Sequence, residues 1–302
     1  FGKDPLYFSM YSACASAFLK HGDTLSGLLL VLSFQLLNRV NETLSISLKN
    51  MQVVEDMLVV TIPRSKCDQA GLRSKVAHLA ANPFDPALCS HTLLALYLMK
   101  GRQPRSTSAL FDGEMESNRK CFTKLLSRHV SEMIVSGEAE RSAKDVGTHS
   151  IRKGGVSWAA NGTTAGPSYY AISLRANWNL GVQQRYVGLE GAQDMYLGRI
   201  LAGLPRTDSA RSEDFMALPP HWHEDDLEVV DGIIDSIYET SVRKNMNSLV
   251  LRRITASLVH HMPALVALNG SKYNLPLSPE EKAALPTPIT GGSSDFLKAT
   301  GI

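Results

Sequence analysis

The sequence has few cysteines, and none of them are paired at short spacing. Cys14, Cys67, Cys89 and Cys121 are scattered along 302 residues, whereas a structural zinc site or a dithiol redox motif needs cysteines or histidines close together. The sequence therefore offers no cysteine-based metal or redox motif. Scattered thiols favour reduced structural cysteines and an intracellular protein.

Long apolar segments and a large net charge are also missing. The longest apolar run, Leu25 to Leu37, contains Ser26, Gly27, Ser33 and Gln35, and it is shorter than the roughly 20 residues that span a bilayer. We expect no membrane segment. A net charge of +2 does not indicate a nucleic-acid-binding protein by itself, although a local basic cleft is compatible with it.

The chain does not begin with methionine, and no signal peptide follows Phe1. We expect it to be a fragment or a processed product of a longer protein. At this length it can bury a core without disulfides or metals.

The hydrophobic pattern predicts a mainly α protein with a small antiparallel β-sheet (α+β). Alternation at Leu44, Ile46 and Leu48 predicts one strand, and 57–62 and 76–79 predict two more. The expected helices cover residues 6–19, 24–38, 89–99, 119–136, 149–160, 168–175, 181–189, 226–238 and 242–262, with a last one starting at Ser278. The composition changes after Leu204-Pro205, which predicts a domain over 1–205 and a helical C-terminal extension over 206–302.

The most informative stretch is Thr148 to Gly155, because it holds His149 and Arg152 three residues apart. At the start of a helix these side chains share one face and can converge on a single anionic atom. Such a site suits a phosphate. Trp178 and Tyr186 follow about three dozen residues later, and the fold can bring their indole and phenol side chains to the same site.

Two upstream cations can complete this site. Arg39 ends a buried helix, where an unpaired charge is costly, so it needs either a carboxylate such as Glu42 or an anionic ligand. Lys66 lies in the turn that follows Pro63.

The order Arg39, Lys66, His149, Arg152, Trp178, Tyr186 over residues 5 to 205 resembles the catalytic domain of the tyrosine recombinase (phage integrase) family. Within that family the sequence is most similar to the recombinases of Crypton-type mobile elements of eukaryotes. Three runs carry this likeness: His149 to Gly154, Arg175 to Trp178 and Tyr196 to Arg199.

The resemblance implies a site-specific DNA recombinase that cleaves and rejoins strands through a 3′-phosphotyrosyl intermediate, with Tyr186 as nucleophile and no cofactor. Arg39 and Arg152 would hold the phosphate, braced by Glu42, and Lys66 would protonate the leaving oxygen. His149 would shuttle a proton, and the indole N–H of Trp178 would donate to the phosphate.

The same resemblance implies double-stranded DNA as substrate, a homotetramer on two duplexes and a nuclear location. The family's N-terminal DNA-clamping domain is not visible before Arg39, so we expect upstream residues to be missing. The spacing from Trp178 to Tyr186 is one residue shorter than is common in the family, and Tyr196 is a rival nucleophile.

Each of these residues also fits a structural role when taken alone. Arg39 and Glu42 can be a buried pair, Lys66 a surface lysine, and Trp178 and Tyr186 core aromatics. At the level of function, two alternatives remain. One is a catalytically inactive, recombinase-derived DNA-binding or assembly protein, and the other is a type IB topoisomerase-like enzyme.

Two further features have ordinary interpretations. The run from His221 to Asp226 could bind a divalent metal, but behind Pro219-Pro220 it favours the start of a helix with acidic residues at its N-terminus. The basic face Arg119, Lys120, Lys124 and Arg128 of the helix over 119–136 favours a solvated surface over DNA contact.

Overall fold

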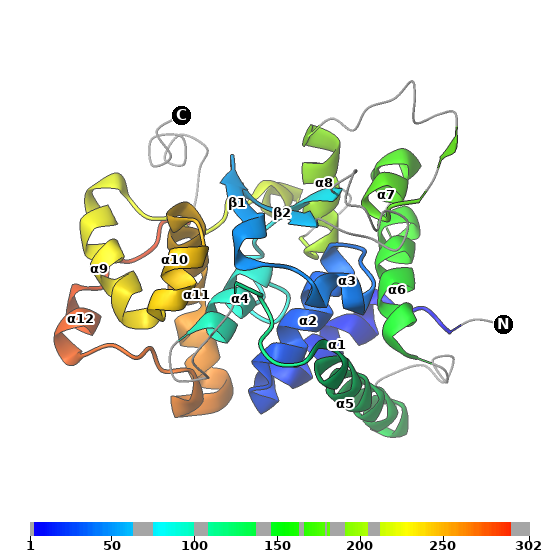
Figure 1. Cartoon of the computed structure of the whole chain (residues 1–302), viewed down its shortest axis with the longest axis horizontal. Helices are drawn as coiled ribbons and strands as arrows, with labels where there is room; N and C mark the ends of the chain where they lie inside the picture. The colour runs from blue at the N-terminus through cyan, green and yellow to red at the C-terminus, as the bar shows by residue number, and fades with distance from the viewer. Residues whose placement is uncertain are drawn as a thin grey trace.

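The computed structural model describes residues 3–62, 75–99, 108–136, 146–162, 166–178, 180–181, 191–204 and 212–290. Helices dominate this part of the chain, and a three-stranded antiparallel sheet lies among them (Figure 1). The α-helices are α1 (Phe8–His21), α2 (Thr24–Gln35), α3 (Val40–Leu44), α4 (Ser90–Leu98), α5 (Met115–Ser136), α6 (Thr148–Asn161), α7 (Tyr169–Arg175), α8 (Gly191–Leu201), α9 (Leu227–Ile237), α10 (Thr240–Asn245), α11 (Ser248–Asn269) and α12 (Pro279–Ala284). The predicted fold class is confirmed.

Helices α2 and α4 form the centre of the core. Every residue of α4 and nearly every residue of α2 is buried, as expected for helices that are apolar on all sides. The two helices pack against each other, with α1 and α6 against α2 and α11 against α4. Asp23 fixes the start of α2, since its carboxylate accepts from the N–H of Ser26 at 3.1 Å.

The sheet has the order β1-β2-β3, with β1 over Met51–Val54, β2 over Met57–Ile62 and β3 over Lys75–Leu79. Strands β1 and β2 form a hairpin in which Met51 pairs with Val60. Strand β3 packs against α7 and α8. Its first residue, Lys75, donates to the carbonyl of Leu36 at the end of α2.

The strand predicted at Leu44, Ile46 and Leu48 is wrong. Leu44 is the last residue of α3, and the first strand begins only at Met51. The alternation has a physical origin, because Ile46 and Leu48 are both buried in the irregular connection from α3 to β1, whose backbone bonds to Leu110 and Ser108. This pairing is limited to an isolated bridge between Ser47 and Ala109.

The C-terminal helices do not follow the predicted bounds. The helix expected over 242–262 is split into α10 and α11, and Asn247 caps α11 through a 2.8 Å bond from the N–H of Leu249. Helix α11 continues past Pro263 to Asn269, because Leu265 is buried in the core beyond the proline. The domain boundary at residue 205 stays a prediction.

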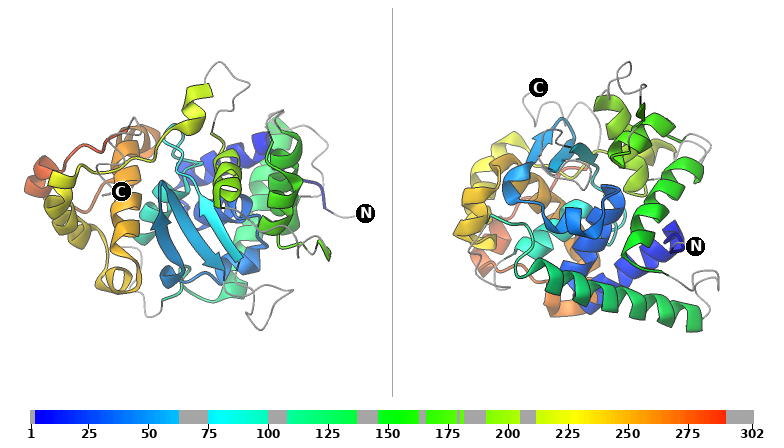
Figure 2. Two further views of the ribbon diagram at one scale, coloured as in Figure 1. Left: turned by 90° about the horizontal axis from the view of Figure 1, so that it is seen from above. Right: turned by 45° about the vertical axis from the view of Figure 1, so that its right-hand side comes forward.

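Seen from above, the sheet lies between the C-terminal helices on one side and α6 to α8 on the other (Figure 2). Within the described ranges, no helix combines the length and the apolar character that crossing a bilayer would require.

Candidate active site: a cationic pocket between α3, α6 and α7

The C-terminal turn of α2 delivers Arg39 to the site. The N–H of Leu37 bonds to the carbonyl of Phe34 and that of Asn38 to Ser33, at 3.2 and 3.1 Å. This is the Schellman pattern, in which the residue after the helix adopts a left-handed conformation. Leu37 does so with φ 51°, although leucine seldom occupies that region. Arg39 follows Asn38 and is the N-cap residue of α3.

Two basic side chains, the half-buried Lys75 and the buried Arg175, cap the same end of α2. Lys75 donates to the carbonyl of Leu36 and, at 2.6 Å, to Oδ1 of Asn38, while Arg175 donates to the carbonyl of Gln35 at 3.2 Å. Positive charge is favourable at a helix C-terminus, where carbonyl groups lack intrahelical partners. Burial, followed by the charges of Arg175 and Arg152, holds the pKa of Lys75 well below its usual value.

Asp194 of α8 compensates the charge of Arg175. Its carboxylate accepts from Nε and Nη2 of Arg175 at 2.8 and 2.7 Å, in a pair that is almost fully buried. The backbone N–H and the ring of His78 donate to the same carboxylate. Burial alone would raise the pKa of Asp194, but Arg175 and His78 outweigh it and lower the pKa.

Glu42 holds Arg39 in place. Its Oε1 accepts from Nη1 of Arg39 at 2.8 Å, and its Oε2 accepts from the backbone N–H of Arg39 at 2.9 Å. Nη1 of Arg152 lies 3.8 Å from Oε2. Burial of this carboxyl favours a raised pKa, but the hydrogen bonds from Arg39 and the charges of Arg39 and Lys75 lower it. Glu42 is thus an ionised brace between two guanidinium groups.

Helix α6 carries His149 in its first turn and Arg152 one turn later. Two glycines let this helix approach its neighbours closely. A Cβ on Gly154 would lie 1.8 Å from the carbonyl oxygen of Leu6, and one on Gly155 would lie 2.6 Å from Leu37 and 2.9 Å from the carbonyl oxygen of Phe34. The predicted helix is confirmed, and its glycines set the distance from Arg152 to the turn that presents Arg39.

Trp178 reaches the site through a second Schellman turn, at the end of α7. Its N–H bonds to the carbonyl of Ser173 at 2.9 Å, and Asn177 is left-handed with φ 51°. Arg152 donates to the carbonyl of Ala176 in the same turn. Arg152 and Trp178 are therefore fixed relative to each other.

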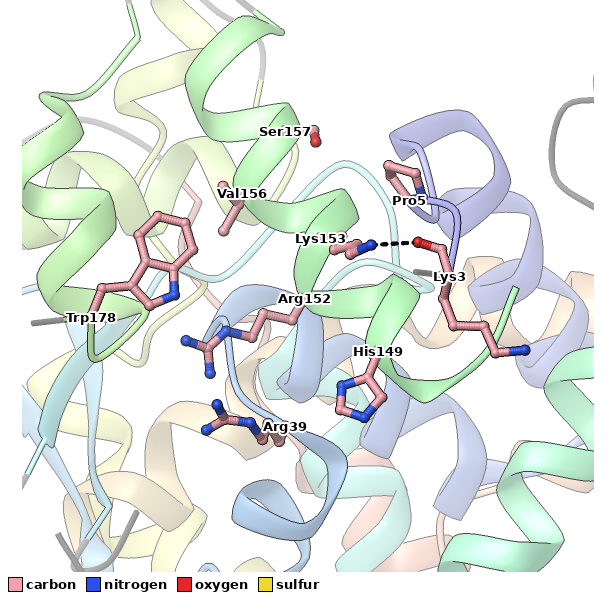
Figure 3. Close-up of a pocket in the computed structure, with 9 residues that line it drawn as sticks. All are labelled: Lys3, Pro5, Arg39, His149, Arg152, Lys153, Val156, Ser157 and Trp178. Atoms are coloured by element: carbon pink, nitrogen blue, oxygen red, sulfur yellow. Dashed lines mark hydrogen bonds between the residues drawn. The ribbon is translucent and has the colours of Figure 1, made fainter. Parts of the chain in front are cut away.

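These side chains line one pocket with a volume of about 580 Å³. Arg39, Arg152 and His149 lie close together, with the indole of Trp178 beyond Arg152 (Figure 3). The lining residues are Lys3, Pro5, Arg39, His149, Arg152, Lys153, Val156, Ser157 and Trp178. No acidic residue is among these described lining residues, so the pocket can hold a tetrahedral oxyanion through guanidinium and imidazole donors.

Lys66 and Tyr186 lie outside the described residues, as does nearly all of the helix expected over 181–189. The rival tyrosine, Tyr196, is on α8, where it packs against Phe215 with ring centroids 5.1 Å apart. It belongs to a second apolar cluster with Met57 and Ile200, and it is not among the described residues that line the pocket.

The run from His221 to Asp226 opens a helix, as the sequence favoured. The ring of His223 accepts from the N–H of Asp225 at 3.4 Å, and Glu224–Asp226 form a 3₁₀ turn directly before α9. His221 is buried and contacts the carbonyl of Pro219. In the part of the chain that the structure describes, no three His, Cys, Asp or Glu residues are grouped to hold a metal ion.

On α5, most residues of the basic face form ion pairs with glutamates of the same helix. Arg119 and Lys120 contact Glu116, and Arg128 contacts Glu132. These short-range pairs are typical of a solvated helix surface.

Sequence reasoning missed Lys75 and the pair of Arg175 with Asp194. Arg175 belongs to one of the runs on which the family resemblance rests, yet its partners are distant in sequence and no local pattern indicates them. It also missed Lys3 and Lys153, which line the pocket. Lys153 Nζ donates to the carbonyl of Lys3 at 2.6 Å and so ties the N-terminal segment to α6.

The arrangement of these helices around the small sheet is the fold of a tyrosine recombinase catalytic domain. Among solved structures, the chain is similar to an FLP recombinase in complex with a Holliday junction, with a TM-score of 0.51 and 12% sequence identity. The match covers 83% of this chain and 63% of that chain. No protein-family model and no curated protein matches the sequence. At this identity the similarity concerns the fold.

Proposed function

We propose that this chain is a site-specific DNA recombinase that works through a covalent tyrosine intermediate. The observation that carries the proposal is the convergence of Arg39, His149, Arg152 and Trp178 on one pocket of a recombinase-type fold. These residues come from the turn before α3, the first turns of α6 and the turn after α7. A pocket of this charge suits a phosphodiester whose negative charge increases in the transition state.

In the proposed reaction, the hydroxyl of Tyr186 attacks the phosphorus of one DNA strand. The new bond joins phosphorus to the phenol oxygen, and the bond from phosphorus to the 5′ oxygen breaks. His149 takes the proton of the phenol, and Lys66 gives a proton to the leaving 5′ oxygen. Arg39 and Arg152 hold the non-bridging oxygens, with Trp178 as an additional donor.

The resulting 3′-phosphotyrosyl ester conserves the energy of the broken bond, so a 5′ hydroxyl from a second duplex can reverse the reaction and join the strands without a cofactor. Double-stranded DNA is the substrate, and a tetramer on two duplexes is the assembly that strand exchange requires. The resemblance to Crypton-type recombinases supports a role in the integration or excision of a mobile element in a eukaryotic nucleus.

The test is trapping of a covalent adduct on a randomised pool of nicked suicide duplexes, followed by sequencing of the trapped DNA. We expect the wild-type chain to give an adduct at a preferred sequence, with Tyr196→Phe still active and Tyr186→Phe inactive. Arg152→Ala should lose the adduct, whereas Lys244→Ala on α10 should keep it.

Three outcomes would contradict the proposal. A folded wild-type chain that binds DNA but forms no adduct would be a recombinase-derived binding protein. An adduct that persists in Tyr186→Phe and disappears in Tyr196→Phe would assign the nucleophile to Tyr196. Relaxation of supercoiled DNA at no preferred sequence would indicate a topoisomerase-like enzyme.

A further inference from the structure

The pocket has two chemically different walls. Arg39 and Arg152, with His149 beside them, form a cationic wall, and Val156 and Trp178 form an apolar one next to Arg152 (Figure 3). The cationic wall by itself satisfies a phosphate group. The pocket as a whole has a volume of about 580 Å³, within the roughly 300–1,000 Å³ of sites that bind a whole organic ligand. We therefore expect the ligand to carry a second group, attached to the phosphate, whose apolar faces contact the apolar wall.

A second aromatic ring extends this wall at the surface. Tyr169, the first residue of α7, is 64% exposed, and its ring centroid lies 6.1 Å from that of Trp178. Ser168 caps α7 by accepting from the N–H of Ala171 at 3.2 Å. Tyr169 thus lies at the start of α7, and Trp178 lies in the turn that follows its end.

The other tryptophans of the chain have packing roles. Trp158 stacks on Phe8 with centroids 3.9 Å apart and donates to the carbonyl of Ile200. Trp222 is buried and donates to the carbonyl of Arg252. Trp178 is half-buried, and of the three tryptophans it is the one among the described residues that line the pocket with Arg152.

We propose that Trp178 and Tyr169 form a stacking site for an unpaired DNA base adjacent to the phosphate bound by Arg39 and Arg152. The inference rests on the phosphate site of the proposed function and adds a base-binding site to it. The base must be unpaired, because an aromatic side chain reaches the face of a base only after that base leaves the duplex stack. Stacking accepts any base, since every base has a π-face.

The test compares two oligonucleotides with identical phosphates. A fluorescently labelled thymidine tetranucleotide and its abasic analogue are titrated with the wild-type chain, and binding is followed by fluorescence anisotropy. Stacking contributes about 1–3 kcal/mol per base, so we expect the tetranucleotide to bind roughly 5- to 150-fold more tightly than the abasic analogue.

Variants show whether this preference comes from the two rings. Tyr169→Ala should lower this preference several-fold while the affinity for the abasic analogue stays unchanged, and Trp178→Ala should lower the preference as well. Tyr169→Phe keeps the ring and should retain the preference. Met216→Ala, at another exposed apolar side chain, serves as the control. Since Tyr169 is mostly exposed, its variants should fold normally.

Each outcome has a definite meaning. Equal binding of both oligonucleotides, or a preference that Tyr169→Ala and Trp178→Ala both retain, would overturn this inference and leave the phosphate site in place. Loss of the preference in Tyr169→Phe as well as in Tyr169→Ala would exclude stacking at this ring. Failure to bind either oligonucleotide would contradict the phosphate site and the base site together.

Discussion

Nζ of Lys75 donates a hydrogen bond of 2.6 Å to Oδ1 of Asn38, the residue immediately before Arg39. The same ammonium group donates to the carbonyl of Leu36. The side chain of Lys75 thus joins the first residue of β3 to the turn that presents an arginine of the pocket. The arrangement shows how residues outside the pocket determine the position of a residue that lines it.

Burial of Lys75 predicts a pH dependence of stability. Its pKa is well below the usual 10.5 in the folded chain, so the unfolded chain binds more protons between the two pKa values. Stability should therefore increase with pH through this window, by at most about 1.4 kcal/mol per pH unit. Urea denaturation between pH 7 and 10 measures the free energy of unfolding of the wild type and of Lys75→Met. The wild type should gain stability relative to Lys75→Met as the pH increases. A constant difference would contradict the prediction.

Asp194→Asn should destabilise the chain strongly. The substitution leaves the guanidinium of Arg175 buried without its counter-charge, which costs about 3–5 kcal/mol in comparable buried pairs. Asp231→Asn breaks the partly exposed pair of Asp231 with Arg252 and should cost less than about 1 kcal/mol. Urea denaturation measures both free energies of unfolding, and equal losses would show that Asp194 is not a structural anchor.

The low pKa of Asp194 also has a pH consequence. A carboxyl whose pKa falls on folding contributes stability at neutral pH, and that contribution is lost as the pH falls through the usual carboxyl range and below it. The wild type should lose more stability than Asp194→Asn between pH 6 and 3. Equal losses of stability in the two proteins would contradict a stabilising role of the ionised Asp194.

Gly154→Ala should disturb the contact of α6 with the N-terminal segment. Its Cβ would lie 1.8 Å from the carbonyl oxygen of Leu6, and overpacking of this kind costs about 1–3 kcal/mol or more. Gly232→Ala is the control, because a Cβ at this position in α9 meets nothing within 4 Å. That change should stabilise the helix by about 0.5–1 kcal/mol. Thermal unfolding distinguishes the two, and tolerance of Gly154→Ala would count against the close approach.

Glu42→Gln should slow the reaction with little effect on DNA affinity. The neutral amide keeps the size of the side chain but weakens the hold on the guanidinium of Arg39, and a loss of about 1.4 kcal/mol in the transition state corresponds to about tenfold in rate. Rates of adduct formation measure it. Glu116→Gln changes a glutamate that pairs with Arg119 at the same spacing on α5 and should leave the rate unchanged.

The sequence was sufficient where a local pattern decides the structure. The spacing of His149 and Arg152 correctly predicted a helix, because helical periodicity needs only neighbouring residues. Glu42 was correctly predicted as the partner of Arg39, since the two are three residues apart. Alternation at Ile46 and Leu48 misled the strand prediction, because the connection from α3 to β1 buries both residues although Leu48 already begins a 3₁₀ turn.

Long-range contacts could not be predicted in the same way. Lys75 reaches Asn38 across 37 positions, and Arg175 reaches Gln35 across 140. No periodicity or spacing relates such residues, so the cations that cap α2 become visible only in the fold. The left-handed conformation of Leu37 was equally unpredictable, because leucine has no intrinsic preference for it.

The central claim is that Arg152 balances the charge of the phosphate that is cleaved. It is tested most directly by the rate of adduct formation on DNA whose scissile phosphate, once mapped, is replaced by a neutral methylphosphonate. If Arg152 acts by charge, Arg152→Ala should be inactive on ordinary DNA and regain cleavage on the methylphosphonate. If Arg152→Ala is equally inactive on both substrates, or equally active on both, the pocket does not bind the scissile phosphate and the account is wrong.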